Sequence, residues 1–202
     1  QGPEVSRDAY LANLEFVKFI IDKEDPRDHK VYFMNTQNHR AHPPYMRLVG
    51  INSRERGAIT YMPRLTSPDG TPGLYIIDFQ PNDSYSFEDI DRILKILTLQ
   101  MPLLKGKVAF HPLNGNLRQY ESEKDKYKNG GVAVYLDSDI YKNISFLPLN
   151  IASGFGKLRV YDNEMRSSPR DILICPTLPN EMPRVAGVIT ETRQTPLSHV
   201  NL

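Results

Sequence analysis

The two side chains with the clearest chemical potential stand near the end of the chain, at Ser198 and His199. A neutral imidazole, with an ordinary pKa of about 6.5, is a good nucleophile at neutral pH and can carry a labile phosphoryl group. The pair follows an apolar run at 185–190 and a short polar loop, so we expect a helix to begin at or just beyond Ser198. Because the free N–H groups of a helix start favour the oxygens of an anion, His199 is a candidate phosphoryl carrier.

The sequence that leads to this pair consists of short apolar runs separated by turn-forming residues. These runs are rich in β-branched residues and predict three strands, at 156–161, 171–175 and 185–190. The sequence pattern changes to these short, turn-separated runs near Pro148. We therefore expect two domains, residues 4–148 and residues 149–202.

The first of these domains is expected to be α/β. Apolar and β-branched runs predict strands at 16–22, 31–34, 58–61, 74–79, 107–110 and 132–136. Apolar residues recur at helical spacing after Ser86, a suitable N-cap with acidic residues following it, so residues 74–110 predict a strand–helix–strand unit. Ser6 resembles another helix start, and the charged stretch 114–131 is expected to be a solvated helix or a loop. The fold class is therefore α+β.

The order of motifs in the last quarter of the chain is similar to the swivelling phosphohistidine domain of pyruvate phosphate dikinase, phosphoenolpyruvate synthase and their relatives. The segments that carry the similarity are 154–160, 171–174, a loop with three prolines, 186–191 and 198–199. The form of 195–202 resembles a branch described as phosphoenolpyruvate/pyruvate-binding-domain proteins. The resemblance implies that residues 149–202 form the β-rich first half of a swivelling β/β/α domain, cut off shortly after His199.

The resemblance also implies an activity. The chain would be the N-terminal fragment of a multidomain, ATP-dependent phosphotransferase, in which His199 passes a phosphoryl group from ATP to pyruvate or another acceptor, and Ser198 caps the helix or bonds the transferred group. ATP and Mg²⁺ would be bound by a domain that follows in the family. The fragment alone is expected to bind neither and to be inactive.

One departure from the family pattern lies just before the Ser-His pair. Most relatives carry two glycines there, which let the backbone approach phosphate, whereas this chain has Gln194 and Thr195. Pro196 stiffens the loop and lacks an N–H group. The candidates for contacting phosphate are therefore Arg193, Gln194 and Thr195. The alternative hypothesis is a binding or protein-interaction module, residues 4–148, attached to a swivelling domain that has lost its activity.

The composition of the chain limits the kinds of partner and the cellular compartment that we expect. The 202 residues carry a net charge of +1, which argues against a nucleic-acid partner, and no apolar run approaches the roughly 20 residues that span a bilayer. The single cysteine excludes an internal disulfide framework. Residues 1–3 resemble a tag-protease remnant, so an export signal could have preceded Glu4. We expect a soluble protein and favour a cytoplasmic location. We also expect self-association through the apolar faces that the second half of the swivelling domain would otherwise cover.

Other candidate residues have simpler explanations. His39 and His42 have a spacing found in metal sites but lack further placed ligands, so we favour a polar loop and predict no metal site. His111 follows a strand and is expected to be a structural histidine with satisfied nitrogens. Cys175 ends an apolar strand and is expected to be a buried, inert thiol. Four arginines are expected to lie in a solvated loop rather than at an anion site: Arg47, Arg54, Arg56 and Arg64.

Overall fold

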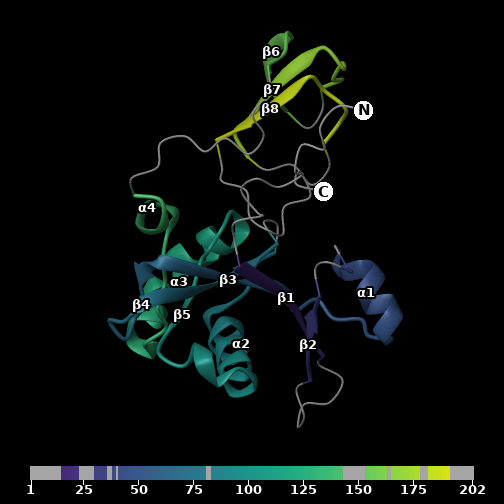
Figure 1. Ribbon diagram of the computed structural model, residues 1–202. Coiled ribbons are helices and arrows are strands. Elements are labelled where there is room, and N and C mark those ends of the chain that lie inside the picture. Colours follow the sequence, from purple (N-terminus) through teal and green to yellow (C-terminus); the bar gives the residue numbers. More distant parts are fainter. Residues whose placement is uncertain are drawn as a thin grey trace. The chain divides into compact units, whose positions relative to one another are not determined.

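The structure is a computed structural model that describes residues 15–22, 30–35, 38–39, 41–80, 83–142, 153–162, 165–177 and 182–191. The chain divides into two compact units (Figure 1). The larger unit is Leu14–Asn143, and the described part of the smaller unit lies within 153–191. The α+β class is confirmed, because the larger unit combines helices with a mixed sheet and the smaller unit contains a parallel sheet. The helix start expected at Ser6 lies outside the described residues.

The larger unit is built on a five-stranded sheet in the order β2-β1-β3-β4-β5. The strands are β1 (Glu15–Ile21), β2 (Val31–Met34), β3 (Arg56–Thr66), β4 (Pro72–Phe79) and β5 (Val108–Phe110). The first four run antiparallel to their neighbours, whereas β5 is parallel to β4. A parallel neighbour requires a crossover, which α2 (Phe87–Gln100) supplies. The predicted strand–helix–strand unit is thus confirmed.

Helix α2 begins where the sequence predicts. The Ser86 side chain accepts a hydrogen bond from the Asp89 N–H at 3.2 Å, and Glu88 and Asp89 lie in the first turn. Both features satisfy or complement the free N–H groups of a helix start. The helix is followed by a single 3-10 turn, η2 (Pro102–Leu104).

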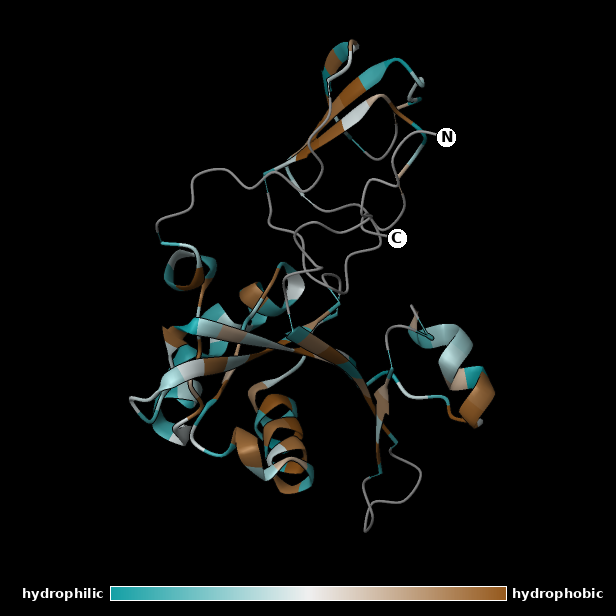
Figure 2. Cartoon of the chain, in the orientation of Figure 1, coloured by the Kyte–Doolittle hydropathy of each residue, from teal (hydrophilic) through white to brown (hydrophobic). Residues whose placement is uncertain are grey.

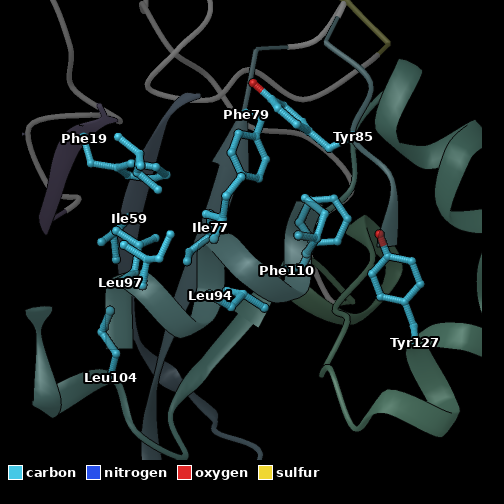
Figure 3. Close-up of a cluster of buried hydrophobic side chains, with 14 of the residues drawn as sticks. Phe19, Ile59, Ile77, Phe79, Tyr85, Leu94, Leu97, Leu104, Phe110 and Tyr127 are labelled. Carbon is cyan, nitrogen blue, oxygen red and sulfur yellow. The ribbon is translucent and has the colours of Figure 1, made fainter. Parts of the chain in front are cut away.

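The main core lies between one face of this sheet and the helices α2 and α3 (Gly115–Gly130). Figure 3 shows Phe79 close to Tyr85 and Phe110 close to Tyr127, with ring centroids 4.5 Å and 6.0 Å apart. The hydropathy colours of Figure 2 show the apolar stripe of α2. The aliphatic residues beneath the rings include Ile59, Ile77, Leu94, Leu97 and Leu104.

The charged stretch 114–131 forms a helix, which was one of the two expected structures. The helix is not only a solvated surface element. Tyr120 and Tyr127 on α3 are buried in the core. The helix is kinked at Glu123, whose backbone φ is −118°. The Glu123 carboxylate accepts a hydrogen bond from the Phe87 N–H at 2.9 Å, so α3 caps the free N-terminal end of α2.

Two elements differ from expectation. Residues 132–136 were expected to form a strand but make only one bridge, Phe110 to Val134, and then turn into α4 (Asp137–Ile140). Helix α1 (His42–Val49) was not predicted at all. It has only eight residues, which leaves little periodicity to read, and its prolines occupy the first helical turn, where a missing N–H has no cost.

The smaller unit contains three parallel strands in the order β6-β7-β8. They are β6 (Lys157–Val160), β7 (Asp171–Cys175) and β8 (Gly187–Thr190), so all three strands expected in this region are present. Consecutive parallel strands require that the chain cross over between them, and the carboxyl ends of all three lie at one edge of the sheet.

Candidate functional site

The residues predicted to carry chemistry lie outside the described part of the chain. This holds for Ser198 and His199 and for the three candidate phosphate ligands, Arg193, Gln194 and Thr195. The structure does describe the strand that precedes them. β8 ends at Thr190, and the Glu191 N–H donates to the Cys175 carbonyl at 2.9 Å, at the carboxyl edge of the parallel sheet. Loops at this edge carry the functional residues of many α/β folds.

A second carboxyl edge lies in the larger unit, where β4 and β5 run parallel. The buried His111 directly follows β5, and its backbone N–H donates to the Ile77 carbonyl at 3.0 Å. Its Nδ1 lies 2.6 Å from Oδ1 of Asp78 on β4. Its Nε2 lies 3.0 Å from Oδ1 of Asp137, the first residue of α4. We call these three residues the Asp-His-Asp relay.

The two carboxylates of the relay favour the protonated, positively charged form of the His111 ring. Burial alone would lower the pKa of His111, but the charges and hydrogen bonds of Asp78 and Asp137 outweigh it and raise that pKa to about 9. At neutral pH the ring is therefore protonated, and each ring nitrogen donates to one carboxylate. A ring that holds its proton so tightly is a poor general base, so the relay suits the fixing of structure rather than proton transfer. The prediction that both nitrogens of His111 are satisfied is correct.

The two partners of His111 were not predicted from the sequence. Asp78 interrupts the apolar run of β4, and a carboxylate at a buried strand position requires a partner. That signal was visible in the sequence, although it did not say which residue the partner was. Asp137 carried no comparable signal, because it lies in a stretch that was expected to follow a strand.

His42 is the first residue of α1. It is 3% exposed, and its Nε2 has no hydrogen-bond partner among the described residues. Burial, followed by the charges of Lys18 and Arg56, lowers its pKa to about 4, so the ring is neutral. The expected polar loop is wrong for this residue, because His42 begins α1 and packs against the sheet. His39 lies outside the helix, with its ring 5.0 Å from that of Tyr45.

The four arginines lie on three different elements rather than in one loop. Arg47 is on α1, Arg56 and Arg64 are on β3, and only Arg54 is in a connection. Arg56 is half-buried and donates to the Met46 sulfur at 3.7 Å. The expectation of a solvated loop therefore holds for Arg54 alone, because the strand β3 begins earlier and ends later than its apolar residues indicate.

The remaining candidate groups give no further site. Cys175 is buried, and burial raises the pKa of its thiol, as the prediction of an inert thiol requires. Within the described ranges, the acidic, histidine and cysteine side chains form no group of three that could hold a metal ion. None of the helices in the described part of the chain has the length and apolar character needed to cross a bilayer. Comparisons with protein-family models, curated proteins and solved structures find no match for this chain.

Proposed function

We propose that this chain is part of an ATP-dependent phosphotransferase in which His199 carries the phosphoryl group. The observation that supports the proposal is the parallel β6-β7-β8 sheet, because the sequence that follows β8 starts from its carboxyl edge and contains Ser198 and His199 eight and nine residues after Thr190. This is the edge at which phosphate-binding loops are commonly placed in α/β folds.

The proposed step is a phosphoryl transfer to nitrogen. A ring nitrogen of neutral His199 attacks a phosphorus of ATP, a P–N bond forms, and the P–O bond to the departing nucleotide breaks. The phosphoryl group then passes to pyruvate or another acceptor, which restores the neutral ring. Arg193, Gln194 and Thr195 would supply donors to the phosphoryl oxygens, and Mg²⁺, bound with ATP by the family's nucleotide-binding domain, would screen the phosphate charge.

Radiolabelling tests this proposal. The full-length protein that contains this chain is incubated with ATP labelled at its β and γ phosphates, and bound label is measured before and after treatment with acid. Wild type should acquire acid-labile label, His199→Ala should acquire none, and the matched control His39→Ala should behave like wild type. Label that persists in His199→Ala, or its absence from wild type, would overturn the proposal.

A second candidate function, self-association through the smaller unit, is favoured by the apolar face of that unit's sheet. Leu158, Val160 and Ile189 on β6 and β8 are 58%, 64% and 49% exposed. Parallel sheets are ordinarily covered on both faces, so such a face is suited to a partner, here a second copy of the chain. Light scattering tests this: a dimer should dissociate in Val160→Lys, and Lys95→Ala, at an exposed residue of α2, is the control.

A further inference from the structure

The described part of the larger unit ends just after the short helix α4, which apolar packing and a hydrogen bond hold to the sheet. Ile140 packs against Leu74 and Ile76 of β4 and Ala109 of β5. The Asp137 carboxylate accepts a hydrogen bond from the His111 ring. A four-residue helix has almost no stability of its own, so its contacts with the sheet and with His111 determine whether it forms.

The two halves of the relay differ in their access to water. His111 and Asp78 have side chains that are 3% and 5% exposed, whereas the Asp137 side chain is 41% exposed. The His111–Asp78 pair therefore belongs to the core and opens only with it. The His111–Asp137 bond reaches the surface, where opening brings the released carboxylate directly into water.

We propose that the His111–Asp137 bond is a latch that holds α4 against the sheet and opens locally, releasing α4 while the core stays folded. Every residue of the latch lies in the larger unit, so the proposal is independent of the chemistry proposed for His199. Elements that move in proteins are commonly those with a low free energy of local opening, and α4 would be one of them.

We next consider which charged groups of the described residues can influence the His111–Asp137 bond. Asp78 faces the ring from β4 and Asp137 faces it from α4. On β3, the residue paired with Asp78 is Ala58, which cannot titrate. The residue of β1 paired with Ala58 is Lys18, one strand farther from His111. The other acid close by, Asp139, accepts a hydrogen bond from the Leu136 N–H within α4 itself. A change at Asp137 should therefore act through His111.

Hydrogen exchange of the α4 amides tests the latch. The N–H groups of Ile140 and Tyr141 donate within α4, to Leu136 and Asp137 at 3.0 Å and 2.9 Å. In Asp137→Ala both amides should lose about tenfold in protection, because a hydrogen bond to a charged group shifts an opening equilibrium by that order. Asp137→Asn can still accept a neutral hydrogen bond and should lose less. The core amides of Ile59 and Ile77 exchange only through unfolding of the whole unit, so they should stay far better protected than the α4 amides in wild type and in both variants.

Two further readouts separate a latch from a merely structural contact. Chymotrypsin should cleave after Tyr141 about tenfold faster in Asp137→Ala than in wild type. The α4 protection of wild type, corrected for intrinsic exchange, should fall as pH rises from about 8 to 10, and this fall should be absent in Asp137→Ala. Asp91→Asn on α2, which removes one charge elsewhere, is the matched control. The latch is refuted if α4 protection is unchanged in Asp137→Ala, or if the α4 amides of wild type are as well protected as those of Ile59 and Ile77, because α4 then opens only when the whole unit unfolds.

Discussion

His111 and Asp78 form a buried ion pair, with the Nδ1 of the ring 2.6 Å from a carboxylate oxygen, at the carboxyl ends of two parallel strands. His42 is also buried, and its Nε2 has no hydrogen-bond partner among the described residues. The two histidines therefore respond to pH in opposite directions, and the stability of the larger unit should show both responses.

The first prediction is that the stability of the larger unit peaks near pH 6.5. The folded pKa of His111 is raised from 6.5 to about 9, so its contribution is complete below pH 6.5 and is lost as pH rises through 9. The folded pKa of His42 is lowered from 6.5 to about 4, so its contribution is complete above pH 6.5 and is lost as pH falls through 4. Each limb should slope by about 1.4 kcal/mol per pH unit.

Urea unfolding at a series of pH values between 4.5 and 9 would measure this dependence. His111→Gln should flatten the alkaline limb only, and His42→Gln should flatten the acid limb only. A profile that is flat in wild type, or a variant that flattens the wrong limb, would contradict the assignment of these two charges.

The second prediction concerns Gly57, a buried glycine in β3. A Cβ atom at this position would lie 2.6 Å from the Asp78 carbonyl oxygen and 2.7 Å from the Phe19 ring. The carbonyl belongs to the neighbouring strand and cannot move aside, so Gly57→Ala should destabilise the larger unit by about 2 kcal/mol or more. Thermal unfolding would measure the loss. Gly154→Ala, where nothing lies within 4 Å, should be nearly neutral.

The third prediction is that one substitution stabilises the protein. The Thr60 side chain is 1% exposed, and its hydroxyl has no hydrogen-bond partner among the described residues. Thr60→Val keeps the shape of the side chain and removes the buried unpaired hydroxyl, so stability should increase by about 1 kcal/mol. Thr60→Ser, which keeps the hydroxyl and leaves a small void, should decrease stability. An unchanged or lower unfolding midpoint for Thr60→Val would show that the hydroxyl is satisfied.

The fourth prediction concerns the cap that α3 gives to α2. The Glu123 carboxylate accepts from Lys126, Gln119 and the Phe87 N–H, and these hydrogen bonds lower its pKa to about 2. Its contribution should therefore be present above pH 4.5 and be lost as pH falls toward 2. Glu123→Gln should cost about 1 kcal/mol at neutral pH, measured by chemical denaturation. Glu121→Gln, an exposed neighbour on α3, is the control.

The strands and α2 could be predicted because their signals are local. Alternating and β-branched runs marked β1, β2, β4 and the three strands of the smaller unit, and Ser86 marked the start of α2. Helix α1 was missed because its stability comes from packing: Met46 and its partly buried neighbours rest on Ile20 and Met34 of the sheet. Residues 132–136 have the composition of a strand, but they make a single bridge to β5 and then turn away.

The sequence by itself determined the α+β class, the crossover that makes β5 parallel to β4, and the presence of a Ser-His pair just beyond a strand. These depend on side-chain periodicity and on residues close together in the chain. The tertiary structure decided what the buried polar groups do. Asp78, His111 and Asp137 are separated by 33 and 26 residues; they meet because parallel strands bring Asp78 and His111 to one edge and α4 brings Asp137 to the same ring. His42, which is buried beside the positive charges of Lys18 and Arg56, stays neutral, whereas His111 carries a charge.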